Sequence, residues 1–224
     1  MKRKDIMKAE TYEKVITVQD YLDNYCDIEL FQEKCKLCPV YGWSWSCPPF
    51  DGFDTLKYWR SFHSLIIVCR KLIMSESDKA AYRRSVAEEF VNDKPKADDW
   101  VSESGKMAVK GEIKNGGDGE RFNINKLIDG NLAGLMEELV NLEKIYPGSN
   151  ALIPGSCIVC GYGNCARKKG LPCRHPDKMH HSLESLGSDL DKTSKDLFGI
   201  EMKWIEGDEL PDYFVQIGGL LIKE

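Results

Sequence analysis

The sequence has no long hydrophobic run. Its longest apolar stretch is the segment LIIVC at residues 65–69, which is far shorter than the ~20 residues that cross a bilayer. The opening segment 1–14 is basic but lacks the apolar core of a secretory signal peptide. We therefore expect a soluble, cytoplasmic protein that does not interact with membranes.

The sequence also lacks an excess of positive charge. Its 31 Lys and Arg face 36 Asp and Glu, which gives a formal net charge of −5 and argues against a dedicated nucleic-acid-binding protein. No phosphate-binding glycine loop, Ser-His-Asp arrangement or H-E-x-x-H motif is present. The GGDG run at 116–119 follows no clear strand, and we interpret it as a turn. The sequence does not decide whether the protein is an enzyme.

Cysteine is present in moderate number and is unevenly placed. The 9 cysteines in 224 residues are a smaller share than the about 8–10% of small disulfide scaffolds. Thiols stay reduced in the cytoplasm, so clustered cysteines there indicate metal binding rather than disulfides. Cys26 and Cys69 stand apart, and we interpret them as buried core thiols. The other seven form two groups: Cys35, Cys38 and Cys47, then Cys157, Cys160, Cys165 and Cys173.

The pattern of apolar residues predicts an α+β protein, formed as a single domain over 1–224. We expect one mixed β-sheet with packed helices and two cysteine-rich metal-binding loops. The polar stretch 92–120 is predicted to be a mobile insertion or hairpin. Strands are expected at 12–18, 64–73, 151–153, 200–205 and 213–222. Helices are expected at 19–33, 54–62, 76–92, 125–146, 182–186 and 191–198.

The second cysteine group has the spacing C-x2-C-x4-C-x7-C. Four thiolates this close in sequence can bind either tetrahedral Zn²⁺ or an iron–sulfur cluster, and Gly161 and Gly163 allow the loop to turn back on itself. A zinc ribbon usually joins two C-x2-C pairs across a longer gap, whereas this compact run is closer to a cluster loop. The spacing favours a [4Fe–4S] cluster, with zinc as the alternative.

The first cysteine group has the spacing C-x2-C-x8-C-P-P and supplies only three local ligands. The fourth ligand could be Cys26, a histidine such as His63 or His175, a cysteine of the second group, or an exogenous molecule. Three protein ligands with one open position are typical of catalytic metal sites. A remote residue that closes a purely structural site is the other interpretation.

Basic residues gather around the second cysteine group. They are Arg167, Lys168, Lys169, Arg174 and Lys178, and Asp177 is the only acidic residue among them. They could form a docking surface for an acidic redox partner protein or a small anionic substrate. They could equally compensate the negative charge of a four-thiolate cluster. Both interpretations remain open from the sequence.

The two cysteine motifs together resemble a cysteine-rich family of predicted metal-binding proteins, the domain of unknown function 2284. The resemblance spans most of the chain, from about residue 12 to 222, and implies a metal-binding protein with suspected iron–sulfur ligation but no known reaction. In the first motif the matching residues are Cys35, Cys38, Tyr41, Gly42, Trp45, Cys47, Pro48 and Pro49. In the second motif they are Gly155, Ser156, Cys157, Cys160, Cys165, Pro172, Cys173, Arg174, Pro176, Ser182, Glu184 and Gly187.

Three functional hypotheses follow. The first is an iron–sulfur protein for electron transfer or redox chemistry, with a helix that starts at Ser182 and directs its N–H groups at the cluster. The second is a zinc-stabilised structural or interaction module without redox activity. The third is a metalloenzyme that acts on a small anionic substrate at the three-cysteine site.

Overall fold

The computed structural model describes residues 8–92, 124–157, 159–161 and 163–223. Backbone contacts divide the chain into two compact units. Unit 1 contains residues 1–10, 71–131 and 203–215, and unit 2 contains residues 11–70, 132–202 and 216–224. All seven grouped cysteines belong to unit 2. Most of the predicted insertion at 92–120 lies outside the described residues.

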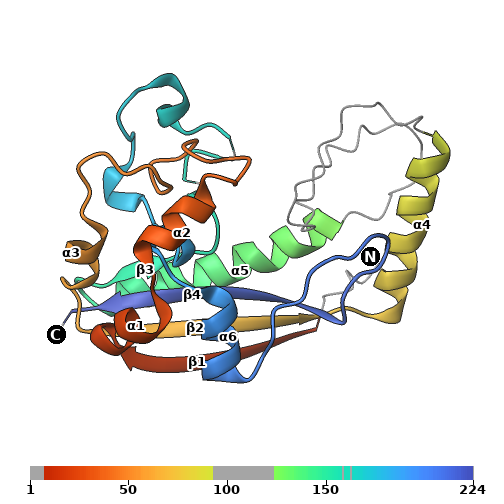
Figure 1. The fold of residues 1–224 in the computed structure, drawn as a ribbon, viewed down its shortest axis with the longest axis horizontal. Coiled ribbons are helices and arrows are strands. Elements are labelled where there is room, and N and C mark those ends of the chain that lie inside the picture. Colours follow the sequence, from red (N-terminus) through yellow and green to blue (C-terminus); the bar gives the residue numbers. More distant parts are fainter. Residues whose placement is uncertain (1–7, 93–123, 158, 162, 224) are drawn as a thin grey trace. The chain divides into compact units, whose positions relative to one another are not determined.

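One four-stranded sheet has the order β1-β2-β4-β3 (Figure 1). Its strands are β1 Ala9–Thr17, β2 Ser64–Ile73, β3 Asn150–Leu152 and β4 Tyr213–Ile222. β3 pairs antiparallel with β4, and the backbone bonds at the strand ends give the same direction for the other two pairs. The α+β class is confirmed, but the sheet is antiparallel rather than mixed. The mixed sheet was expected from the order of helices and strands along the chain, and that order does not fix which strands become neighbours.

Helices start where a side chain can cap them. Thr17, Asp27, Asp54 and Asp189 each accept a hydrogen bond from a backbone N–H of the first turn that follows, which satisfies donors that a helix start leaves free. The helices so capped are α1 Val18–Tyr25, α2 Ile28–Cys35, α3 Thr55–Trp59 and α6 Leu190–Phe198.

The helix expected over 19–33 is two helices. Cys26 is extended and forms an isolated antiparallel bridge with Ser188, and Asp27 then caps a new helix. The apolar positions continue at helical spacing across this break, so their pattern did not reveal it. The strand expected at 200–205 is also absent, since that segment has no ladder partner.

In unit 2 the sheet is covered by α5, Ile124–Ile145, whose last turns belong to this unit. Leu135 and Leu139 of α5 contact Val68 of β2 and Leu220 of β4 in one buried cluster. Burying such aliphatic side chains is the main source of stability for a domain of this kind. This core is a fixed base from which the cysteine loops extend.

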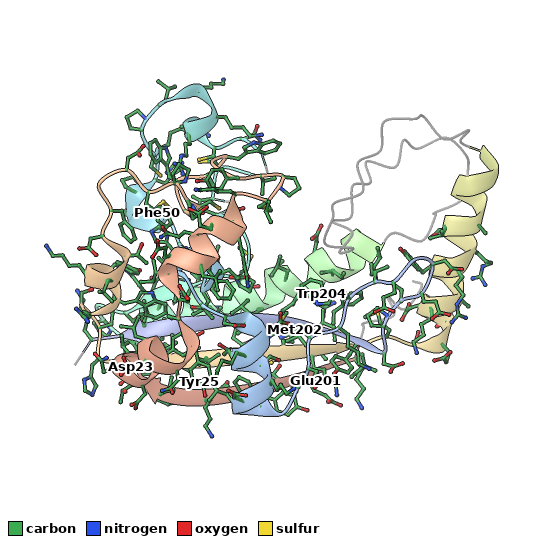
Figure 2. The ribbon with its side chains drawn as sticks, in the orientation of Figure 1. Asp23, Tyr25, Phe50, Glu201, Met202 and Trp204 are labelled. Carbon is green, nitrogen blue, oxygen red and sulfur yellow. The ribbon has the colours of Figure 1, made fainter. Side chains whose placement is uncertain are left out.

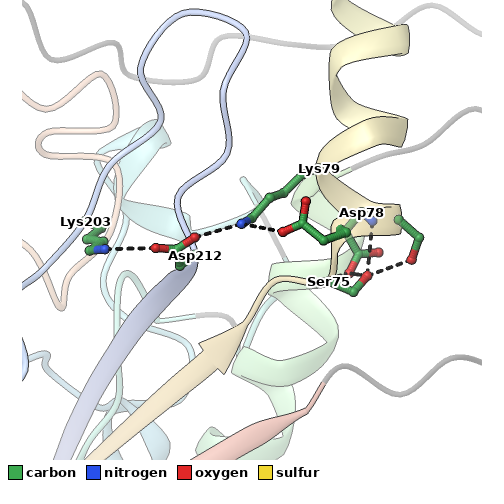
Figure 3. A network of polar contacts seen from close by, with 7 residues as sticks. Ser75, Asp78, Lys79, Lys203 and Asp212 are labelled. Carbon is green, nitrogen blue, oxygen red and sulfur yellow. Dashed lines mark hydrogen bonds and ion pairs between the residues drawn. The ribbon is translucent and has the colours of Figure 1, made fainter.

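In unit 1, α4 spans Glu76–Asn92 and starts with a reciprocal cap. The backbone N–H of Ser75 donates to Asp78 Oδ2 at 3.0 Å, and the N–H of Asp78 donates to Ser75 Oγ at 3.1 Å. Figure 3 shows these contacts beside Asp212, which accepts from Lys79 Nζ at 2.7 Å and Lys203 Nζ at 3.2 Å. The two cations lower the pKa of Asp212 through hydrogen bonds and charge.

Among the described residues, no helix combines the length and the apolar character needed to cross a bilayer.

Candidate metal centre

The first cysteine loop leaves the end of α2 and folds into successive tight turns. Cys35 is the last residue of α2, and its carbonyl accepts from the N–H of Cys38 at 3.0 Å. The N–H of Cys47 donates to the carbonyl of Ser44 at 3.1 Å. Burial raises the pKa of Cys35 to about 11, with further increases from the charges of Cys47 and Cys38. The three thiols are therefore electrostatic neighbours.

The second cysteine loop connects β3 to the short 3₁₀ turn η3, Glu184–Leu186. Gly161 and Gly163 have φ of 82° and 73°, a left-handed conformation that glycine adopts at little cost. Burial raises the pKa of Cys157, and the charges of Cys173 and Cys160 raise it further. The structure thus brings three of the four predicted ligands of this group near one another.

The two loops contact each other directly, although 111 positions separate the paired residues in sequence. The backbone N–H of Cys157 donates to Ser46 Oγ at 3.0 Å, and the Cys47 thiol lies 3.5 Å from Ser156 Oγ. In Figure 1 the loop after α2 and the loop after β3 accordingly lie together. The sequence left open whether the cysteine groups meet, and the structure places them in one region.

Arg167 fastens the two loops together. It lies on η1, Ala166–Lys169, and its guanidinium donates to three carbonyls of the first loop, those of Ser44, Cys47 and Pro49. It also lies over the Trp45 ring, 4.9 Å from the centroid. A planar guanidinium can bind several acceptors at once. One side chain of the second loop therefore holds the backbone of the first loop at three positions.

Cys165 differs from the other cysteines in its surroundings. Burial raises the pKa of its thiol, but hydrogen bonds from the backbone N–H groups of Arg167 and Trp45, from the Ser44 hydroxyl and the charge of Arg174 outweigh that effect. The pKa therefore lies below the ordinary value. The thiolate is the form that binds metal. Residues of both loops stabilise the thiolate of Cys165 and so favour its binding to a metal.

A buried histidine supports the first loop from behind. His181 Nδ1 donates to the carbonyl of Ser46 at 3.1 Å, and burial lowers the pKa of the ring. The ring stacks on Phe53 with centroids 4.9 Å apart and meets the Phe50 ring edge-on at 5.2 Å. Figure 2 labels Phe50 in this region. Phe50 and Phe53 therefore form a packed support for the first loop, whereas Trp43 of the same loop is exposed.

Glu184 is a residue of the centre that our sequence analysis did not predict as a ligand. Its Oε2 is buried and accepts no hydrogen bond from any described residue. Burial raises the pKa of this carboxyl, while its own backbone N–H and the Ser182 hydroxyl lower it. The carboxylate in turn contributes to the raised pKa of Cys35. The only sequence signal was its place in the S-x-E-x-x-G motif.

The residues considered from the sequence as a fourth ligand of the first cysteine group differ in burial and in hydrogen-bond partners. The Cys26 thiol lies 3.7 Å from Ser188 Oγ, and burial raises its pKa to about 12. Cys69 is fully buried in β2, in accordance with its interpretation as a core thiol. His175 is exposed at the start of a second 3₁₀ turn, η2 Pro176–Lys178.

The helix expected to start at Ser182 is shorter than predicted. It is the three-residue turn η3, and its N–H groups are used within the turn. Ser185 N donates to Ser182 Oγ, and Ser182 N donates to Ser185 Oγ. These donors therefore do not serve a bound anion. The Ser-x-x-Ser pattern satisfies its own donors, which a prediction from helix capping alone did not consider.

The donor set suits a thiophilic metal group. All the described cysteines are free thiols, six of the seven grouped ones are half-buried, and Cys38 is exposed. Within the described part of the chain, no three His, Cys, Asp or Glu side chains already converge on a point suited to a single ion. Soft thiolates on two loops that contact each other nevertheless suit a zinc or iron–sulfur group.

Comparison with known families finds a match over most of the chain. The family of predicted metal-binding proteins called DUF2284 matches residues 26–222, and the chain therefore belongs to this family, as the motifs indicated. No curated protein and no solved structure matches the chain.

Proposed function

With membership of a predicted metal-binding family as the premise, we propose that this protein is an iron–sulfur protein that transfers electrons. Cys157, Cys160, Cys165 and Cys173 bind one [4Fe–4S] cluster. Cys35, Cys38 and Cys47 bind a second metal group. When bound, such clusters supply one-electron redox chemistry.

The observation that carries this proposal is the direct contact between the two cysteine loops. The Cys47 thiol lies 3.5 Å from the hydroxyl of Ser156, the residue immediately before Cys157. Electron transfer needs a short path between redox groups. Two groups bound by these loops would be neighbours, so an electron that enters at one could leave through the other.

The chain's own residues tune the environment of the proposed clusters. Hydrogen bonds to ligand sulfur and nearby positive charge raise the potential of a cluster. The Cys165 sulfur accepts backbone hydrogen bonds and lies near Arg174. Packing of Phe50 and Phe53 around His181 keeps water from one side of the first loop.

We further propose that the exposed side of the centre docks an acidic electron-transfer protein. Lys168, Lys169 and Arg174 are exposed there, and Lys168 lies 3.5 Å from the Trp43 ring centroid. Leu37 and Leu171 are also exposed, at 82% and 54%. A patch that combines apolar side chains with one sign of charge is typical of a protein-binding surface. A large partner uses the apolar contacts, which a small anionic substrate would not need.

Purification without oxygen tests the iron–sulfur assignment. The expected protein is brown, with broad absorbance near ~400 nm, and contains iron and acid-labile sulfide. Cys69→Ser is the matched control, since it alters a buried thiol outside both groups and should leave the metal content unchanged. Zinc without sulfide would overturn the assignment, because Zn²⁺ is redox-silent, and would favour the structural module.

Ionic strength tests the docking surface. With a small acidic ferredoxin as the electron donor, we expect the rate of reduction to fall steeply as salt screens the attraction. Lys168→Glu combined with Lys169→Glu should slow reduction at low salt at least tenfold. Lys192→Glu, on the exposed surface of α6, is the control. Equal rates for both charge variants would exclude this docking surface.

A further inference from the structure

Ser46 lies at the point where the two cysteine loops meet. Its side chain is buried, with an exposed fraction of 0%, and its Oγ accepts from the backbone N–H of Cys157 at 3.0 Å. The same oxygen lies 2.9 Å from Ser44 Oγ and 3.8 Å from the Cys47 sulfur. One hydroxyl of the first loop therefore contacts a cysteine of each group.

The backbone on either side of Ser46 is held in place by the second loop and its continuation. The carbonyl of Ser46 accepts from His181 Nδ1 at 3.1 Å. The carbonyls of Ser44 and Cys47 both accept from the guanidinium of Arg167. A fully buried hydroxyl needs hydrogen-bond partners within the protein, so the fixed backbone leaves Ser46 with the three partners named above.

A second hydroxyl lies beside the Cys47 sulfur and comes from the other loop. Ser156 is half-buried, and its Oγ lies 3.5 Å from this sulfur. A sulfur that binds a metal as a thiolate has no hydrogen of its own to donate, whereas each hydroxyl has one. When Cys47 is a ligand, Ser46 and Ser156 are therefore the donors and the sulfur is the acceptor.

The charge of that sulfur decides the direction of the bond between the two buried serines. The hydrogen of Ser46 can go to Ser44 Oγ or to the Cys47 sulfur, and a hydrogen bond to a charged acceptor is the stronger one. Ser44 then donates to Ser46 Oγ, which accepts from Ser44 and from the Cys157 N–H together. Hydrogen bonds in such a chain polarise one another, so a change of charge at Cys47 reaches the backbone of Cys157.

We infer that Ser46 is a positioning residue that couples the two cysteine sites, because its hydroxyl donates to the Cys47 sulfur while it holds the Cys157 N–H. This inference rests on the proposed function, since it needs a metal group at Cys47. It goes further by assigning the link between the sites to one side chain. Loss of the Ser46 hydroxyl should affect both loops, and loss of the Ser156 hydroxyl should affect only the site of Cys47.

The test uses the full-length chain, loaded without oxygen with iron and inorganic sulfide. The variants are Ser46→Ala and Ser156→Ala, and Ser194→Ala is the matched control. Ser194 also has an exposed fraction of 0%, and its hydroxyl donates to the carbonyl of Ile200 at 2.6 Å, away from both loops. It should show what the loss of a buried hydroxyl does by itself.

Two readouts report on the two loops separately. A reductive titration followed by electron paramagnetic resonance gives the potential of each metal group, and Cys47→Ser identifies the signal that belongs to the first loop. Hydrogen exchange followed by mass spectrometry with fragmentation gives the protection of the Cys157 amide. The second readout does not depend on electron transfer.

The three variants should differ in pattern. Ser46→Ala should make reduction of the first-loop group about tenfold less favourable, because a ligand sulfur loses a hydrogen-bond donor. It should also speed exchange of the Cys157 amide about tenfold or more, because that N–H loses its acceptor. Ser156→Ala should lower the potential but leave the exchange unchanged, and Ser194→Ala should change neither.

The contrary outcomes separate this inference from the proposed function. If Ser46→Ala leaves either the potential or the exchange as in the wild type, Ser46 does not couple the sites, and the iron–sulfur assignment still stands. Equal acceleration of exchange in Ser46→Ala and Ser156→Ala would mean general loosening of the loops and would also overturn the coupling. If the wild type takes up no iron and sulfide, the proposed function fails and the inference fails with it.

A further variant decides the question if Ser46→Ala does not fold. Ser44→Ala removes the hydroxyl that donates to Ser46 Oγ, so it should shift the potential and the exchange in the same directions by smaller factors. Wild-type values for both in Ser44→Ala would overturn the coupling.

Discussion

The guanidinium of Arg167 donates to the backbone carbonyl of Cys47, a residue 120 positions earlier in the chain. The same group reaches the carbonyls of Ser44 and Pro49. One side chain thereby sets the path of the segment that carries the third cysteine of the first group. The geometry of the candidate centre depends on a residue that is itself not a ligand.

Arg167→Ala should destabilise the protein by about 3 kcal/mol, because three carbonyls lose a charged donor at once. Urea unfolding with a two-state fit measures the change. Arg174→Ala is the control, since Arg174 donates within its own loop to the carbonyl of Asn164. We expect the control to cost less than about 1 kcal/mol. Equal losses would show that Arg167 does not hold the loops together.

Metal removal should lower thermal stability through the second cysteine group. Metal that binds only the folded chain stabilises it by RT ln(1 + [L]/Kd), where [L] is the free metal concentration. The loaded wild type should therefore melt at a higher temperature than the chelated protein. Cys157→Ser should reduce this difference, and Cys69→Ser should retain it. Differential scanning calorimetry provides the measurement. A Cys157→Ser protein with the full difference would place the stabilising metal elsewhere.

Acid should destabilise the protein through His181. Burial lowers the pKa of this ring below its ordinary value of 6.5; the hydrogen bond to Ser46 opposes this effect, and the charge of neighbouring His180 adds to it. As the pH falls below the ordinary value of 6.5, the ring of the unfolded chain binds a proton, whereas the buried ring of the folded chain stays neutral until its own lower pKa is reached. The free energy of unfolding therefore falls as the pH drops through this range. One proton gives a limiting slope of about 1.4 kcal/mol per pH unit.

Urea unfolding of the metal-free protein between pH 7.5 and 5.5 measures this slope. His181→Phe keeps an aromatic ring beside Phe53 but removes the titration, so its slope should be flatter than that of the wild type. His63→Phe is the control at another histidine. If His181→Phe and the wild type show parallel curves, His181 does not cause the acid sensitivity.

Gly187→Ala should cost about 3 kcal/mol or more. The residue has φ of 95°, and the new Cβ would lie 2.5 Å from the Ile28 Cα, so strain and overlap add together. Gly199→Ala is the matched control, because it has φ of 68° with nothing within 4 Å of the new atom. It should cost about 1 kcal/mol. Chemical denaturation of both variants gives the two losses in the free energy of unfolding. The difference between them is the contribution of the steric overlap with Ile28.

Ser75→Ala should cost about 1 kcal/mol, because it removes the hydroxyl that accepts from the Asp78 N–H at the start of α4. Ser77→Ala, one position into the helix, should cost less, since the Ser77 hydroxyl contacts only that of Ser75. Thermal unfolding followed by circular dichroism tests the pair. A larger loss at Ser77 would contradict the capping role.

The sequence predicted best those elements whose signals are local. The bounds of β2, α4 and β4 agree with prediction. The ends of these elements are visible in the local sequence, as the ends of an apolar run for the two strands and as a capping residue for the helix. The break at Cys26 was not predictable, since it depends on a bridge to Ser188, 162 positions away. The antiparallel order likewise depends on strand partners, which periodicity does not encode.

The same distinction applies to the candidate centre. Cysteine spacing identified the two groups because ligands within one loop are a local feature. The meeting of the loops through Ser46 and Cys157 joins distant segments, and no spacing predicts it.

The distance along the chain between the cysteine loops has a consequence for how the protein matures. Non-local contacts form late, because the intervening chain must first be ordered. During synthesis the thiols of the first loop emerge long before Cys157, so they pass through a period without their partner loop. Metal would then bind at the complete centre only after the sheet has folded. A chain that carries its full metal content would be one in which the two cysteine loops have met correctly.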